Sequence, residues 1–122
     1  MERDPRAYLW EVQQAADAIL KFTSGLDFAA YAESELVQSA VERKFEIIGE
    51  ALNRLSRFEP VLAGSVSDAR RAIDFRNQLI HGYHQTEHDK VWEAIEIDLP
   101  RLHLAVTALL SDMGSPDHPA RP

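Results

Sequence analysis

Cysteine is absent from this sequence, and so are long apolar runs. The lack of cysteine excludes disulfides, thiolate metal ligands and cysteine nucleophiles. No apolar run approaches the roughly 18 residues that span a bilayer, and the N-terminal stretch "MERDPRAYLW" lacks the apolar core of a signal peptide. We therefore expect a cytoplasmic protein that makes no contact with a membrane.

Positive charge is also scarce. The 13 lysines and arginines stand against 20 aspartates and glutamates, and the formal net charge is −7. Proteins that coat nucleic acid without sequence preference are usually basic, because the neutralisation of phosphates drives their binding. This chain as a whole is not of that class. Contact with a polynucleotide would require a local basic patch, or a partner that changes the electrostatic field.

What is present is enough for one globular domain. The chain has 122 residues, of which 45% are hydrophobic and 27% are charged. This length and composition allow a buried core without disulfides or a structural metal. We expect a helical domain over residues 1–112. Residues 113–122 contain the stretch "GSPDHPARP", which is rich in proline and lacks periodicity, and they are predicted to be a disordered tail.

Two long helices are predicted in the first half of the chain. Asp4 is a candidate N-cap, Pro5 suits the first helical position, and Gly25 marks the end of that helix. After a loop or short helical turn over "LDFAAYAE", a second helix is expected from about Ser34 to Phe58. Apolar residues recur in both at steps of three and four. They are Tyr8, Val12, Ala15, Ile19 and Phe22 in the first helix, and Val37, Val41, Phe45, Ile48, Leu52 and Leu55 in the second.

Three further helices are predicted in the second half. Ser67 and Asp68 offer an N-cap for "ARRAIDFRNQLI", which ends at Gly82. Thr86 is expected to cap a helix over "EHDKVWEAIEI", and Asp98 to cap a last helix that carries the final apolar seam. Neither strand-like alternation nor an internal repeat is present. The predicted fold class is therefore all-α, an antiparallel bundle of four to five helices.

The stretch "RNQLIHGY", residues 76–83, gathers chemistry that a helix end does not require. Arg76 carries a planar, permanently charged fork that suits a phosphate. Histidine is the side chain that most readily gains and loses a proton near neutral pH, so His81 can move a proton, and Asn77 can hold an imidazole or a phosphate oxygen. Tyr83 adds a phenol. RNA cleavage needs little more, because the 2′-hydroxyl of RNA is itself the nucleophile. The alternative is an ordinary capping and ion-pair arrangement at a helix end.

The spacing of these residues predicts a dimer. Each residue of an α-helix turns the direction by about 100°, so Asn77 and His81 share a face, whereas Arg76 and His81 point about 140° apart. Convergence on one substrate then requires either a break near Gly82 or a second copy of the motif. We favour the second copy, because two-fold symmetry would place two motifs around one cleft.

Three more residues are candidates for supporting roles. Glu50 could pair with Arg76, or could be an exposed or interhelical glutamate, and its neighbour Gly49 suggests a close approach of two helices. Arg70 and Arg71 could bind RNA phosphates, or could simply be solvated at a helix start. The histidines that flank the motif lack the ligand spacing of a metal site, and we predict no metal.

"RNQLIHGY" resembles the Arg–x4–His–x–Tyr motif of the HepT-like branch of the HEPN ribonuclease superfamily. Three other stretches resemble signature stretches of that family, in the same order and with similar spacing. The resemblance covers about residues 4–110. The three stretches are "AYLWEVQQAADAILKF", "AVERKFEIIGEALNRL" and "VWEAIEIDLPRL".

The resemblance implies a HEPN-like helical bundle that dimerises and holds the motif in a cleft between subunits. It implies a metal-independent endoribonuclease toxin that needs no cofactor, with tRNA as one candidate substrate, neutralised by an MntA-type nucleotidyltransferase antitoxin. Arg76 and His81 match the catalytic pair, and Asn77 matches the polar residue that follows the arginine. Tyr83 matches the tyrosine to which the antitoxin adds AMP. Bulky anions beside Arg76 would fill the cleft and repel RNA.

A second function class stays open at this point. The chain could be a non-catalytic helical dimer that docks a nucleotidyltransferase or binds a nucleotide. The complete set of Arg76, His81 and Tyr83 favours the ribonuclease, while the charge of −7 keeps the binding module open. Incubation of the pure protein with RNA in EDTA would separate the two hypotheses.

Overall fold

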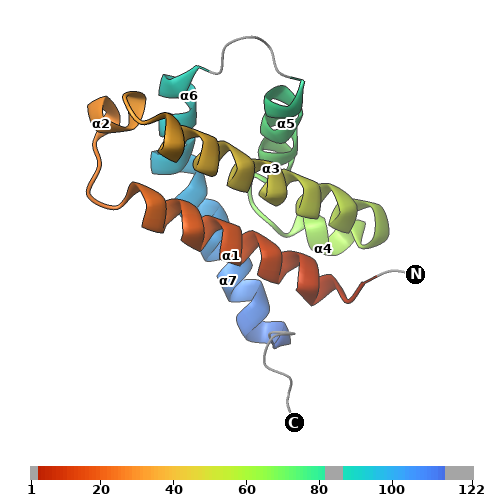
Figure 1. The fold of residues 1–122 in the computed structure, drawn as a ribbon. Coiled ribbons are helices and arrows are strands. Elements are labelled where there is room, and N and C mark those ends of the chain that lie inside the picture. Colours follow the sequence, from red (N-terminus) through yellow and green to blue (C-terminus); the bar gives the residue numbers. More distant parts are fainter. Residues whose placement is uncertain (1–2, 82–86, 115–122) are drawn as a thin grey trace.

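The computed structural model of the protein describes residues 3–81 and 87–114. Within these ranges every regular element is a helix and no strand occurs, which confirms the predicted all-α class (Figure 1). Among the described residues, none of the helices combines the length and the apolar character needed to cross a membrane. The predicted cap Thr86 lies outside the described residues, as do Gly82, Tyr83 and most of the predicted tail.

Two long helices form the centre of the molecule. Helices α1 (Pro5–Thr23) and α3 (Glu35–Phe58) lie side by side and run in opposite directions, joined by the short helix α2 (Phe28–Ala32) (Figure 1). The Asp4 carboxylate accepts a hydrogen bond from the backbone N–H of Arg6 at 2.9 Å, which confirms the predicted N-cap. At the other end Gly25 has φ of +80°, a left-handed conformation that suits glycine.

The second half of the chain packs on this pair. Helix α4 (Pro60–Gly64) is a single turn, and helix α5 (Ala69–Ile80) lies against α3. Helix α6 (His88–Glu93) contacts α2 and leads through the π-helical turn η1 (Ala94–Asp98) into helix α7 (Leu99–Met113), which packs on α1. The four main helical stretches are therefore α1, α3, α5 and the series from α6 to α7.

The prediction that Asp98 caps a separate last helix is wrong. Its backbone is right-handed helical, with φ of −77° and ψ of −41°, and its side chain makes no cap hydrogen bond. The chain continues from α6 into α7 without a break, through a π-helical turn that ends two residues before Pro100. Proline lacks the N–H that would bond to the carbonyl four residues earlier, and a widened turn is a common accommodation. The carboxylate of Asp98 instead lies 3.2 Å from Arg71.

Asp68 holds the predicted N-cap position of α5 but does not cap with its side chain. Its φ of +66° places it in the left-handed region, which aspartate tolerates better than most residues. The carboxylate turns away from the helix and accepts two hydrogen bonds from Arg101, at 3.0 and 2.6 Å. The start of α5 is therefore tied to α7 by an ion pair.

The core follows the predicted apolar seams with one exception. The α3 seam is buried from Val41 to Leu55, and both Leu102 and Val106 of α7 are buried. Phe22, predicted to face inward, is 36% exposed, and the buried residue at that end of α1 is Thr23. Thr23 can be buried there because its hydroxyl donates to the backbone carbonyl of Ile19 at 2.9 Å.

Candidate functional site

Helix α5 approaches α3 closely at Gly49. A Cβ atom at this position would lie 2.8 Å from Cγ of Arg76 and 2.9 Å from the backbone carbonyl oxygen of Ala72. No side chain fits between the two helices at this point, which confirms the close approach expected at Gly49. The glycine thereby allows the stem of Arg76 to lie directly on the surface of α3.

Asn77 connects Arg76 to His81. The side-chain oxygen of Asn77 accepts a hydrogen bond from Nη1 of Arg76 at 2.9 Å. The backbone carbonyl of Asn77 lies 2.6 Å from Nδ1 of His81 and also accepts from the His81 backbone N–H at 3.2 Å. A single residue therefore orients both the guanidinium and the imidazole, although their side chains leave the helix in different directions.

The contact with Asn77 selects one tautomer of His81. A carbonyl oxygen can only accept, so Nδ1 of His81 must carry the proton. In the neutral ring the basic lone pair is then on Nε2. His81 is exposed at the C-terminal end of α5. An exposed imidazole of fixed tautomer has the form that a general base requires.

The charge of Arg76 is only partly compensated. Its Nη2 lies 3.8 Å from Oε2 of Glu50, which is too long for a hydrogen bond, and the same oxygen lies 3.7 Å from Arg43. The Nε atom of Arg76 is buried and has no hydrogen-bond partner among the described residues. Glu50 is thus a half-buried interhelical glutamate shared by two arginines, and Arg76 retains capacity to bind an anion.

A polar cavity of about 290 Å³ lies beside Arg76. Three arginines and one glutamate line it, which leaves a formal charge of +2. A local basic site on an acidic chain is the feature that contact with a polynucleotide would require. The lining residues are Glu50, Asn53, Arg54, Arg57 and Arg76.

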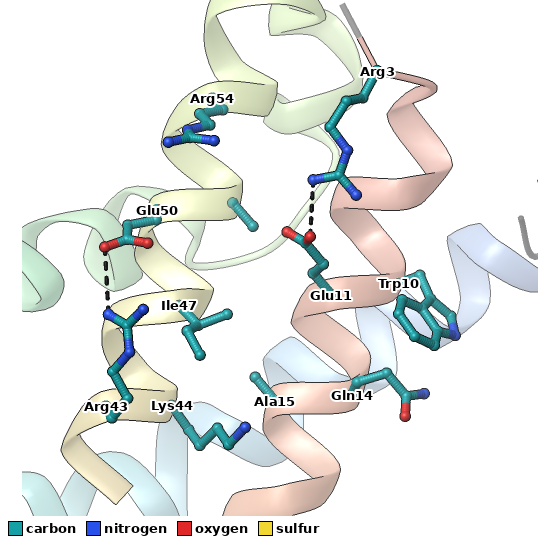
Figure 2. Close-up of a pocket in the computed structure, with 11 residues that line it drawn as sticks. Arg3, Trp10, Glu11, Gln14, Ala15, Arg43, Lys44, Ile47, Glu50 and Arg54 are labelled. Carbon is teal, nitrogen blue, oxygen red and sulfur yellow. Dashed lines mark hydrogen bonds and ion pairs between the residues drawn. The ribbon is translucent and has the colours of Figure 1, made fainter. Parts of the chain in front are cut away.

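A second cavity, of about 390 Å³, lies between α1 and α3 (Figure 2). It shares Glu50 and Arg54 with the cavity beside Arg76, so the two are contiguous. In Figure 2, Arg3 and Glu11 form an ion pair at 2.8 Å on the α1 side of the cavity. The remaining lining residues are Trp10, Gln14, Ala15, Arg43, Lys44, Ile47 and Ala51.

The structure does not bring the other two predicted arginines to this site. Arg70 lies 3.3 Å from Asp74 on the same helix, and Arg71 lies 3.2 Å from Asp98 of η1. Neither residue lines either of the two cavities near Arg76. Both belong to the opposite end of α5, where each cation already has a carboxylate.

The cavity beside Arg76 is instead lined by residues of α3 that were not candidates from the sequence. Asn53, Arg54 and Arg57 line the cavity beside Arg76. A signal existed in the stretch "EALNRLSRF", where the two arginines follow Glu50 at steps of four and three and so share a helix face. That pattern is common on solvated helices, and only the packing of α5 against α3 gives it meaning.

Tyr83 and His84 lie outside the described residues. His88 begins α6, and its ring makes an edge contact with Tyr31, with ring centroids 6.2 Å apart. Burial raises the pKa of the Tyr31 hydroxyl, with a smaller contribution from Glu42. Within residues 3–81 and 87–114, no three histidines, aspartates or glutamates are grouped closely enough to hold a metal ion.

The fold and the site together define an all-helical protein with an arginine, an asparagine and a histidine joined at one helix end. A family model described as "Ribonuclease HepT-like" matches residues 12–109, and the chain belongs to this family. "Probable ribonuclease HepT" of Thermococcus cleftensis is 30% identical over 106 residues, which cover 84% of this chain and 92% of that protein.

A second relative gives the same relation. The Methanocaldococcus jannaschii protein named "Putative RNase MJ1380" is 27% identical over 101 residues, which cover 83% of this chain and 92% of that protein. The comparison with solved structures finds no match. The family resemblance stated from the motif "RNQLIHGY" is therefore confirmed.

Proposed function

We propose that this chain is an endoribonuclease that cleaves RNA without a metal ion. The observation that carries the proposal is the hydrogen-bonded series of Arg76, Asn77 and His81. Membership of the HepT-like family supports it, because relatives of this chain are named as ribonucleases. The basic cavity beside Arg76 supports it further, since it offers a place for a phosphate.

The chemistry uses the two ends of this series, the neutral imidazole of His81 and the charged guanidinium of Arg76. Nε2 of His81 removes the proton of the 2′-hydroxyl, and the 2′-oxygen attacks the adjacent phosphorus. Arg76 stabilises the negative charge that builds on the phosphorane through Nη2, which lies too far from Glu50 for a hydrogen bond. The bond from phosphorus to the 5′-oxygen then breaks, and the 5′-oxygen takes up a proton from water, while His81 releases the proton it removed to solvent. The products are a 2′,3′-cyclic phosphate and a 5′-hydroxyl.

The nature of the products tests this proposal. RNA incubated with the pure protein in EDTA should be cleaved, and the new ends should be 2′,3′-cyclic phosphates. A strict requirement for Mg²⁺ would contradict the metal-free step, and 5′-phosphate ends would contradict it because they indicate attack by water in place of the 2′-hydroxyl. If RNA stays intact under all conditions, the alternative of a non-catalytic helical dimer that docks a nucleotidyltransferase or binds a nucleotide is favoured.

We propose further that the protein acts as a two-fold dimer. Arg76 and His81 leave α5 in different directions, so two copies of the motif around one cleft would complete a site that one copy leaves open. Sedimentation at micromolar concentration should show a dimer. A monomer that retains full ribonuclease activity would contradict the shared cleft.

The regulatory part of the proposal concerns Tyr83. We propose that the protein is the toxin of a toxin–antitoxin pair, with tRNA as one candidate substrate, and that an MntA-type nucleotidyltransferase neutralises it by adding AMP to Tyr83. Tyr83→Phe keeps the ring and removes the acceptor hydroxyl. Intact-mass spectrometry after co-expression should show AMP-sized increments on the wild type alone. Increments that persist on the variant would refute the assignment to Tyr83.

A further inference from the structure

The lysines and arginines of this protein differ in whether they have a carboxylate partner. Twelve of the 13 lie in the described ranges, and eight of these form an ion pair there. The other four have no carboxylate of the described residues within ion-pair distance. They are Lys21, Lys44, Arg54 and Arg57.

Three of these four unpaired cations line the two contiguous cavities. Lys44 lines the cavity between α1 and α3, Arg57 lines the cavity beside Arg76, and Arg54 lines both. All three belong to α3. Arg54 follows Lys44 by ten residues, and Arg57 follows Arg54 by three. On a helix these steps turn the direction by about 280° and 300°, so the three side chains leave one broad side of α3.

We propose that Lys44, Arg54 and Arg57 form a track that binds the phosphates of the RNA strand next to the scissile phosphate. The assignment rests on the proposed ribonuclease function, because the track begins in the cavity that Arg76 lines. From Lys44 to Arg57 the helix advances by about 20 Å, which is long enough for several nucleotides. Figure 2 shows that Lys44 and Arg54 extend from α3 at opposite ends of the cavity between α1 and α3.

The negative charge of the rest of the protein confines RNA binding to this track. With a net charge of −7, most of the surface repels a polyanion. The cavity beside Arg76 has the opposite charge. Glu50 is the single carboxylate that lines it, so a phosphate that enters meets little competition for the arginines. A strand attracted to α3 and repelled elsewhere is directed toward Arg76.

The proposal is tested by comparing two double variants. One loses two positive charges from the track, and the other loses two positive charges from a different surface. The test variant is Arg54→Gln with Arg57→Gln. The matched control is Arg70→Gln with Arg71→Gln, since both arginines are highly exposed, at 78% and 66%, and lie outside the two cavities. Both variants change the net charge equally, so any difference between them reports position.

Two measurements follow for each variant. The first is binding to a short 2′-O-methylated RNA of mixed sequence, which lacks the nucleophile and cannot be cleaved. The test variant should bind about ten-fold more weakly, and its dependence of log Kd on log salt should be shallower by about 1.4, or 0.7 for each lost phosphate contact. The second is steady-state cleavage, where KM should rise about ten-fold with kcat within about two-fold.

Several results would overturn the track. Equal losses in the test and control variants would show that only net charge matters. If the test variant binds RNA as tightly as the wild type, Arg54 and Arg57 do not bind RNA phosphates. A change from dimer to monomer in sedimentation would assign Arg54 and Arg57 to contact between copies of the chain. If the wild type binds the 2′-O-methylated RNA but leaves unmodified RNA intact, the ribonuclease proposal fails, while the binding test still decides whether the track binds RNA.

Discussion

The two ends of helix α5 use arginine in different ways. At the N-terminal end, Arg71 lies 3.2 Å from Asp98 and is 66% exposed. Toward the C-terminal end, Arg76 is 23% exposed and its only described carboxylate, Glu50, lies 3.8 Å away. Charges in the first environment are neutralised and solvated, whereas Arg76 is half-buried with a donor that has no partner among the described residues. The position of the carboxylates, not the residue type, separates a structural arginine from one that can bind a phosphate.

The largest effect should come from the reacting groups themselves. His81→Ala removes the proposed general base, and cleavage should fall by about 10² to 10⁴. Arg76→Ala should cause a loss of similar size, because the charge on the phosphorane is then unopposed. Initial rates on RNA in EDTA measure both. Arg70→Ala is the control from the other end of α5 and should cleave like the wild type. If all three variants have equal rates, the site is elsewhere.

The next effect concerns the contact that positions Arg76. Gly49→Ala places a methyl group against the Arg76 side chain and against the backbone carbonyl of Ala72, which cannot easily move. We expect a loss of about 1–3 kcal/mol in the free energy of unfolding. Denaturant titration measures it. Gly64→Ala is the matched control, since a Cβ atom there meets nothing within 4 Å. If both substitutions cost the same, the close approach of α5 to α3 is not tight.

A smaller effect should separate the two contacts made by Asn77. Asn77→Ala removes the side-chain acceptor of Arg76 but keeps the backbone carbonyl that holds His81. The loss of one hydrogen bond to a charged group should lower cleavage about ten-fold. The imidazole should remain protonated on Nδ1, which nitrogen NMR of the ring can show. A change of tautomer in this variant would contradict the assignment of that contact to the backbone.

The smallest effect should come from the N-terminal end of α5. A double-mutant cycle between Arg71→Ala and Asp98→Asn should give a coupling of about 0.2–1 kcal/mol, because the arginine is exposed to solvent. Unfolding of the two single variants and the double variant measures it. Cleavage should not change in any of the three. A large loss of activity would show that this end of α5 also takes part in the site.

Local signals in the sequence predicted most of the helices. The N-cap at Asp4, the glycine after α1 and the apolar seam of α3 depend on neighbours within a few residues, and the structure agrees with each. The same rules failed at Asp98, where a good capping residue lies inside a continuous helix. A local rule cannot foresee that a π-helical turn will carry the chain through Pro100.

The motif "RNQLIHGY" was also visible in the sequence, and it identified the family correctly. Which other arginines lie near it was not visible. Arg70 and Arg71 are closer to Arg76 along the chain than Arg54 and Arg57 are, yet the latter two line its cavity. Sequence distance misled here because α5 folds back on α3 at Gly49.

The sequence by itself therefore determined the helical class, the family and the motif that carries Arg76 and His81. Tertiary structure alone decided which charges are neutralised. The ion pairs of Arg71 with Asp98 and of Arg101 with Asp68 join residues 27 and 33 positions apart, and they form only when α5, η1 and α7 pack together. Coulomb energy falls with distance in space, not along the chain. The partners of Arg71 and Arg101, and the weak compensation of Arg76, are consequences of helix packing.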